Sequence, residues 1–252
     1  MDGFFILNKE KGITSNQLVQ KIKKSMRFKK VGHLGTLDPM ATGLMVIAVN
    51  RATKFSSYFL ESDKSYYATV KIGSSTDTDD ALGKIIETSE SLPTEEHTHK
   101  VLNSFIGQSL QMAPFYSALK HKGKPLYKYA REGDFILKPP REINVFSIKD
   151  FNFDHDECSF LIHCSKGTYI RSIARDLGKK LGCGAHLSGL KRVSQGKFNI
   201  NQALNTEEVK IKNLISIEEA FKEFSSIKLQ NDQLKIFLNG GKLKNINCED
   251  ND

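Results

Sequence analysis

The feature that most constrains this chain is segment 32–44, which reads GHLGTLDPMATGL. It holds a single carboxylate, Asp38, among three glycines and a proline, and it runs directly into the apolar stretch Leu44–Val49. The Asp-Pro pair favours a turn, and Gly35 and Gly43 suit positive φ or close backbone approach. A short apolar run after such a loop predicts a buried strand. The segment therefore predicts one acid held at the rim of a sheet, the alternative being a structural turn closed by an Asx hydrogen bond.

Length and composition limit the class of protein. A chain of 252 residues with 39% hydrophobic and 26% charged residues fits one large globular domain, or one domain with a small appendage. Its apolar runs are too short to span a bilayer, and no charged region followed by an apolar one opens the chain. We therefore expect a cytoplasmic protein without a membrane partner.

The four cysteines, including Cys183 and Cys248, do not make a disulfide framework in a chain of this length. Cys158 and Cys164 share one face of a predicted strand with Phe160, because side chains alternate along strands, and we expect buried free thiols there. The nearby histidines at positions 155 and 163 suggest zinc, but no second close pair completes a tetrahedral set. No metal is expected.

The basic residues are clustered. The net charge is +8 and the pI is near 9.2, which favours a polyanionic partner. Residues 11–30 contain seven basic side chains and no acid. A second acid-free segment, 120–131, interleaves tyrosines with five cations: Lys120, Lys122, Lys124, Lys128 and Arg131. Aromatic side chains among cations are typical of RNA-binding surfaces, the alternative being two solvated faces.

Periodicity predicts both strands and helices. Thr14 or Ser15 is expected to cap a first helix, Thr168 to cap a later one that ends at Gly182, and Ser216 to open a short third. Residues 114–131 are expected to form a loop and then a helix. The predicted strands cover 4–8, 44–49, 65–73, 145–153 and 159–164, and residues 95–110 are predicted to be helical.

Two further segments carry candidate chemistry. Asp77, Asp79 and Asp80 lie in a polar turn and suggest calcium, although the EF-hand pattern fails, so a metal-dependent hydrolase is one alternative function. Residues 166–171, KGTYIR, join a predicted strand to a helix N-terminus, a junction that often builds sites. Arg171 lies on the first turn there, the alternative being an ordinary surface arginine.

Several segments together resemble the motifs of the bacterial TruB-type tRNA pseudouridine-55 synthases. In family order they are NKEKGITSN (8–16), GHLGTLDPMATGL (32–44), DKSY (63–66), QMAPFYSALK (111–120), KGTYIRSIARDLG (166–178) and GCGAHLSGLKR (182–192). The likeness covers roughly residues 3–200. One departure is Glu10, which stands where the family usually has proline.

This resemblance implies an α+β pseudouridine synthase fold, with a mixed, mostly antiparallel central sheet flanked by helices and a short C-terminal appendage. The implied catalytic domain is 1–205, with a thumb-like insertion at about 105–135 that grips RNA. Residues 206–252 would form an abbreviated or incomplete PUA-like segment. The implied partner is the T-arm of transfer RNA, bound by a monomer.

The resemblance also implies roles for individual residues. Asp38 is the catalytic carboxylate paired with Arg171, Tyr66 stacks on the target uracil, and Tyr169 is a candidate for the later proton step. Leu190 lines the pocket, His33 holds the flipped T-loop, Lys9 braces the catalytic loop, and the five cations of 120–131 hold phosphates.

The implied reaction breaks N1–C1′ and forms C5–C1′, so no cofactor is expected. Asp38 could add to C1′ or remove the C2′ proton, and both routes stay open. A carboxylate kept charged in a dry pocket needs a cationic partner, which Arg171 can supply. A non-catalytic RNA-binding protein on the same fold is the remaining alternative.

Overall fold

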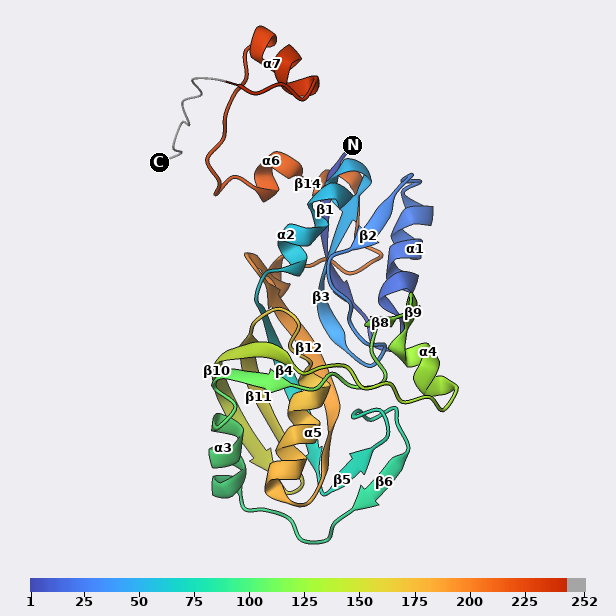
Figure 1. Cartoon of the computed structure of the whole chain (residues 1–252), viewed down its shortest axis with the longest axis vertical. Helices are drawn as coiled ribbons and strands as arrows, with labels where there is room; N and C mark the ends of the chain where they lie inside the picture. The colour runs from blue at the N-terminus through green and yellow to red at the C-terminus, as the bar shows by residue number, and fades with distance from the viewer. Residues whose placement is uncertain (244–252) are drawn as a thin grey trace.

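The computed structural model describes residues 1–243, and its centre is a ten-stranded sheet (Figure 1). The main path runs β14-β1-β3-β12-β4-β11-β10-β7, with β2 paired to β3 and β13 to β12. Only the β12–β3 pair is parallel among these, which confirms the expected mixed, mostly antiparallel sheet. The strands are β1 (Gly3–Lys9), β2 (Val31–His33), β3 (Thr42–Val49), β4 (Lys64–Ile72), β7 (Gly107–Gln111), β10 (Arg141–Asp154), β11 (Glu157–Cys164), β12 (Ala185–Gln195), β13 (Phe198–Asn199) and β14 (Ile215–Ser216).

Helices cover this sheet, and two small hairpins lie outside it. Figure 1 shows α5 lying along β12 and β4, with α3 beside it. The helices are α1 (Ser15–Ser25), α2 (Ser56–Leu60), α3 (Glu95–Asn103), α4 (Leu126–Arg131), α5 (Ile170–Leu181), α6 (Ile217–Ala220) and α7 (Asn231–Leu238). The hairpins pair β5 (Ser74–Thr76) with β6 (Ile85–Thr88) and β8 (Lys120–His121) with β9 (Lys124–Pro125).

Strand β1 is buried on both faces, because side chains alternate along it. Phe5 and Leu7 point into the larger core with α1 and α5, whereas Phe4 and Ile6 point into a smaller aromatic core near α6. This double burial fixes β1 beside β3, the strand into which the loop that carries Asp38 leads.

The helix starts are set by local side chains, with one difference from expectation. Thr14 caps α1 and accepts from the amide of Gln17, as predicted. The N-cap of α5 is Tyr169 rather than Thr168, because the Thr168 hydroxyl donates instead to the Ser165 carbonyl oxygen at 2.9 Å. Gly182 ends α5 at φ +75°, as predicted.

The helix predicted over 95–110 is wrong in its last part. Helix α3 ends at Asn103, and Gly107 has a φ of +106°, which breaks the helical path. Residues Gly107–Gln111 then pair with β10 as an edge strand. Ladder hydrogen bonds to β10 override a local pattern that favours a helix.

The remaining expectations concern thiols and the C-terminal part. Cys158, Cys164 and Cys183 are buried free thiols, whereas Cys248 lies outside the described residues, as does the acidic end at 249–252. Ser216 caps α6 as predicted, and β14 pairs with β1. No helix within residues 1–243 has the length and apolar character that a bilayer crossing requires.

Candidate active site

The loop that carries Asp38 is fixed on both sides. Ser15, at the start of α1, uses its hydroxyl to accept from the Leu37 amide and to donate to the Leu37 carbonyl oxygen, both at 2.9 Å. The Gly12 amide donates to the Pro39 carbonyl oxygen at 2.8 Å, and the Ala41 amide donates to that of Asp38 at 3.0 Å. The backbone around the carboxylate is therefore held by main-chain and buried hydroxyl contacts.

Lys9 adds a buried tether beneath this loop. Its side chain is fully buried, and Nζ donates to the carbonyl oxygens of Ile13 at 2.8 Å and Glu10 at 2.9 Å. A longer contact of 3.5 Å reaches the Pro39 carbonyl oxygen. Burial lowers the pKa of Lys9 to about 8. Lys9 thus braces the loop from inside, and its hydrogen bonds hold the backbone at Glu10, where the family usually has proline.

Arg171 forms the ion pair with Asp38. Its Nε lies 2.8 Å from Asp38 Oδ2, and its Nη2 lies 3.3 Å from Oδ1. The same guanidinium donates to the carbonyl oxygens of Thr78 at 3.2 Å and Tyr116 at 2.9 Å. Only 4% of Arg171 is exposed. One buried cation therefore holds the loop of Asp38, the acidic turn at Thr78 and the segment at Tyr116 together.

The three aspartates of the acidic turn already have partners. Asp79 Oδ2 lies 3.1 Å from Nη1 of Arg175, and Asp80 Oδ2 lies 3.7 Å from Nε of Arg171. Burial raises the pKa of Asp79, and the nearby arginines oppose this. Asp77 accepts from the Lys84 amide at 2.8 Å. These carboxylates order the turn, and residues 1–243 contain no group of three His, Cys, Asp or Glu side chains that could hold a metal ion.

A cavity of about 320 Å³ opens above the Asp38–Arg171 pair. It is lined by fifteen residues, among them Asp38, Tyr66, Tyr169, Arg171 and Leu190. Pockets that bind small organic groups start at about this volume. The structure thus gathers all four predicted catalytic residues, with Leu190, around one cavity.

The two tyrosines of the cavity are held differently. Tyr66 on β4 is 7% exposed, and burial raises its pKa to about 12, so its phenol is protonated at neutral pH. Tyr169 is held through its backbone, because Gln111 accepts from its amide at 2.8 Å and donates to its carbonyl oxygen at 3.1 Å. Burial therefore holds the ring of Tyr66, whereas Gln111 holds the backbone of Tyr169.

Sequence reasoning missed Arg192, which lies under the cavity with 1% of its surface exposed. Its Nε donates to the Leu44 carbonyl oxygen at 2.7 Å and its Nη2 to that of Gly35 at 3.1 Å. It is paired in register with Tyr66 across β12 and β4, and the two side chains interact electrostatically. A signal was present, because Arg192 stands two residues after Leu190 and so shares its face of β12.

Lys64 is a second buried cation that sequence reasoning gave no role. It shares one face of β4 with Tyr66, and its Nζ donates to the carbonyl oxygens of Leu60, at 3.0 Å, and Ser62. Burial lowers its pKa to about 8. Lys64 fixes the end of α2 against the cavity wall.

The structure places the other predicted RNA-binding residues outside this cavity. His33 lies on β2, and burial, followed by the charge of Arg192, lowers its pKa. The cations of 120–131 are exposed or half-exposed. Lys124 pairs with Glu132, and Arg131 lies 5.6 Å from the centre of the Tyr127 ring. Their segment reaches the cavity through Ala118, which is one of its lining residues.

Comparison with protein-family models gives two matches. The model described as TruB family pseudouridylate synthase (N terminal domain) matches residues 23–170. The model of the tRNA pseudouridylate synthase B C-terminal domain matches residues 171–230. Together they cover most of the described chain.

Similar proteins include two bacterial enzymes named tRNA pseudouridine synthase B. The one from Francisella philomiragia is 46% identical over 230 residues, which are 88% of this chain and 76% of the relative. The one from Methylobacillus flagellatus is 40% identical over 247 residues, which are 95% of this chain and 82% of the relative. The chain thus spans about three-quarters or more of the length of both relatives.

Two solved structures share the fold. A chain of a Cbf5-Nop10-Gar1 complex superposes with a TM-score of 0.73 at 24% identity, over 96% of this chain and 68% of that one. A chain of an H/ACA RNP bound to a substrate RNA containing 2′-deoxyuridine gives a TM-score of 0.62 at 25% identity. The match covers 82% of this chain and about half, 51%, of that one. These likenesses confirm the expected fold class.

Proposed function

Because this chain belongs to the TruB family of pseudouridylate synthases, we propose that it isomerises uridine-55 in the T-loop of transfer RNA to pseudouridine, with Asp38 as the catalytic carboxylate. The observation that carries this proposal is the Asp38–Arg171 ion pair at the base of a cavity that Tyr66 and Tyr169 also line. A binding protein would not need a paired carboxylate at the bottom of such a cavity.

The first step takes the target base out of the RNA stack. Unstacking costs a few kcal/mol, and an aromatic surface returns roughly 1–3 kcal/mol per base. Tyr66 is the proposed stacking partner, and Leu190 the proposed apolar wall. Because Tyr66 is fixed by burial and by Arg192, its ring needs little reordering when the base arrives.

The chemical step breaks the N1–C1′ bond, and its electron pair leaves with the base. Asp38 then either adds to C1′ or takes the C2′ proton, and both routes use the ionised carboxylate. Arg171 supplies the opposite charge, since a buried carboxylate without a partner would neutralise. After the base turns, C5 bonds to C1′, and this step either expels the Asp38 carboxylate from C1′ or is accompanied by return of the proton from Asp38 to C2′. C5 then loses its proton, for which Tyr169 is the proposed acceptor or relay, and N1 gains one, so the net proton count is unchanged. Every substrate atom is kept, so the reaction consumes no donor or oxidant.

RNA binding is proposed to extend beyond the cavity. The catalytic domain would cover 1–205, and the thumb-like insertion at about 105–135 would grip the T-arm with its exposed cations. Residues 206–252 would form a short PUA-like appendage. The working unit is proposed to be a monomer. Because its substrate is transfer RNA, we place its action in the cytoplasm.

The test is site-resolved pseudouridine mapping of an unmodified transfer RNA transcript after incubation with the protein. We expect complete conversion at position 55 and none in a matched transcript with cytidine there. A transcript that binds tightly but contains no pseudouridine after long incubation would favour a non-catalytic RNA-binding protein instead.

A further inference from the structure

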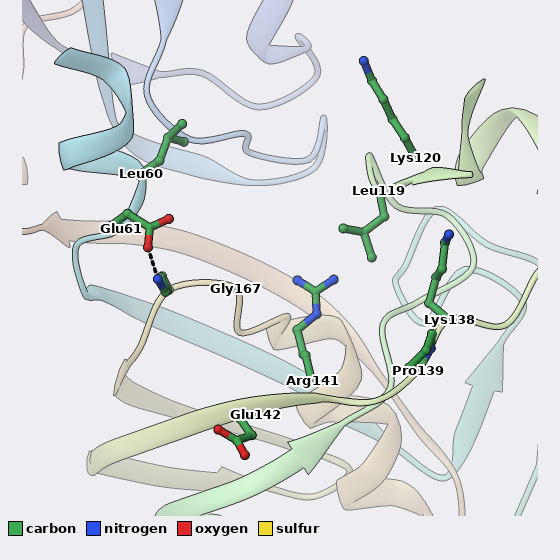
Figure 2. A pocket seen from close by; sticks show the side chains of 10 residues that line it. Leu60, Glu61, Leu119, Lys120, Lys138, Pro139, Arg141, Glu142 and Gly167 are labelled. Carbon is green, nitrogen blue, oxygen red and sulfur yellow. Dashed lines mark hydrogen bonds and ion pairs between the residues drawn. The ribbon is translucent and has the colours of Figure 1, made fainter. Parts of the chain in front are cut away.

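A second cleft opens next to the Asp38 cavity (Figure 2). Its volume is about 540 Å³, and it shares Leu60 and Gly167 with the cavity as lining residues. Ten residues line this cleft, and four of them are cations: Lys120, Lys138, Arg141 and Lys166. They come from the β8 hairpin, the start of β10 and the turn before α5, so the fold itself gathers charge from three separate segments.

The acids of this cleft neutralise only one of the four cations. Glu61 forms an ion pair with Lys166, drawn as a dashed line in Figure 2. Glu142 follows Arg141 on β10, and consecutive strand residues point to opposite sides. Figure 2 accordingly shows Glu142 directed away from Arg141. Within residues 1–243, no ion pair to a carboxylate joins Lys120, Lys138 or Arg141.

Arg141 lies at the boundary between the cleft and the cavity. The centre of its guanidinium is 5.2 Å from the centre of the Tyr169 ring, and Tyr169 lines the Asp38 cavity. A guanidinium that packs on an aromatic face keeps its N–H edge available for a planar or tetrahedral anion. In Figure 2 the guanidinium of Arg141 extends into the middle of the cleft, toward Leu119. One side chain therefore contacts a cavity tyrosine and faces the cleft.

We propose that this cleft binds a phosphodiester of the RNA strand next to the flipped uridine, with Arg141 as its main ligand and Lys138 and Lys120 as supporting charges. The proposal rests on the proposed function, because it assumes that a nucleotide base fills the Asp38 cavity. A base in that cavity leaves its sugar at the mouth with a phosphate on either side. The shared walls at Leu60 and Gly167 place the cleft directly beside that mouth.

The physical consequence is a link between backbone binding and the chemical site. Arginine binds phosphate through charge-assisted hydrogen bonds of fixed geometry. A phosphate held by Arg141 would immobilise the guanidinium against Tyr169 and so help to hold that ring over the cavity. Phosphate contacts position an RNA without reading its sequence, so the cleft would set the register of the strand.

The experiment is a cycle between protein and RNA variants. T-arm RNAs carry a neutral methylphosphonate at one phosphate at a time on either side of the target, and binding is measured for the wild type and for Arg141→Met. We expect one such RNA to bind the wild type on the order of 10-fold more weakly, and Arg141→Met to lose a similar factor on unmodified RNA. On the RNA with the methylphosphonate at that position, Arg141→Met should bind no more weakly than it binds unmodified RNA. The slope of log affinity against log salt should fall by about 0.7.

Lys149→Met is the matched control. Lys149 is exposed on the same strand β10 and lies outside the cleft, so this variant removes one charge and leaves the cleft intact. It should show the same loss on the methylphosphonate RNA as the wild type. If thermal unfolding shows that Arg141→Met does not fold, Lys138→Met takes its place in the cycle.

Two results would overturn the inference. In the first, Arg141→Met binds unmodified RNA as tightly as the wild type does. In the second, the affinity losses from Arg141→Met and from the methylphosphonate multiply at every flanking position, so that no phosphate depends on Arg141. Failure of the proposed function is a separate result, because it appears in the wild type as absence of pseudouridine at position 55. The cycle measures binding and does not depend on turnover, so the two outcomes can be told apart.

Discussion

Two sets of cations surround the proposed RNA site, and they are built in opposite ways. The floor cations, Lys9, Lys64, Arg171 and Arg192, are between 0% and 8% exposed, and each donates to backbone carbonyl oxygens. The thumb cations are Lys120, Lys122, Lys124, Lys128 and Arg131, and these are exposed or half-exposed on short elements. The floor cations use their hydrogen bonds within the protein, whereas the thumb cations face the solvent.

The difference indicates that buried cations position the residues of the site, whereas exposed cations contribute to RNA affinity. A buried cation must be fully hydrogen-bonded, so its partners become fixed with it, and the floor cations thereby hold the loop of Asp38 and the ring of Tyr66. An exposed cation costs little to keep in water and binds phosphates in a salt-dependent way. Substitutions in the floor should therefore change rate or stability, and those in the thumb should change affinity.

Arg171→Met should have the largest effect among these variants. The change removes the partner of Asp38, and we expect a loss of roughly 10³-fold in the single-turnover rate at saturating RNA. Arg175→Met is the matched control, because Arg175 lies one turn later on α5 and pairs with Asp79 outside the cavity. Equal rate losses in both variants would mean that Arg171 acts only by supporting the fold.

Arg192→Met tests the floor through stability. It leaves the carbonyl oxygens of Gly35 and Leu44 without their donors, and we expect a loss of ~2–3 kcal/mol in the free energy of unfolding. Lys128→Met in the thumb should stay within ~0.5 kcal/mol of the wild type. Urea denaturation of both variants measures the difference. Similar free energies of unfolding for the two would mean that floor and thumb cations contribute equally to stability.

Lys122→Met combined with Lys128→Met tests the thumb through affinity. We expect RNA to bind about 10-fold more weakly, with a salt slope lower by about 1.4, or about 0.7 for each lost phosphate contact. The single-turnover rate at saturating RNA should not change. A lower single-turnover rate with unchanged RNA affinity would mean that these lysines contribute to catalysis rather than to RNA binding.

The pH dependence of stability tests the burial of Lys9 in the floor. Burial lowers the pKa of Lys9 from 10.5 to about 8. Above about pH 8 the folded chain has released a proton that the unfolded chain still binds, so this group adds stability as the pH rises toward 10. Compared with Lys9→Met, the wild type should gain ~1–3 kcal/mol over that range. If the free energies of unfolding of the two proteins changed with pH in parallel, the lowered pKa of Lys9 would be contradicted.

Local pattern predicted much of the structure around Asp38. The turn residues around Asp38 and the apolar run after it indicated a loop followed by a buried strand over 44–49, and β3 covers that range but begins two residues earlier, at Thr42. Periodicity predicted a strand over 65–73, which β4 confirms, and Thr14 indicated the start of α1. These features depend on neighbours in the sequence, so the sequence alone contains them.

Contacts between distant segments could not be predicted in the same way. The partners of Arg171 at Thr78 and Tyr116 lie 93 and 55 residues away, and no periodicity joins them. The strand Gly107–Gln111 exists because β10 offers an edge to pair with, although the spacing of apolar residues before Gly107 indicates a helix over 95–110. The position of Arg192 beside Tyr66 could be predicted only from knowing which strand pairs with β4.

The most direct test of the central claim is the single-turnover conversion of uridine-55 by Asp38→Asn, measured beside its affinity for the same RNA. The substitution keeps the shape of the side chain and removes its charge. We expect no detectable pseudouridine and an affinity within a few-fold of the wild type. Measurable conversion by this variant, or loss of RNA binding together with activity, would contradict a catalytic role for the carboxylate.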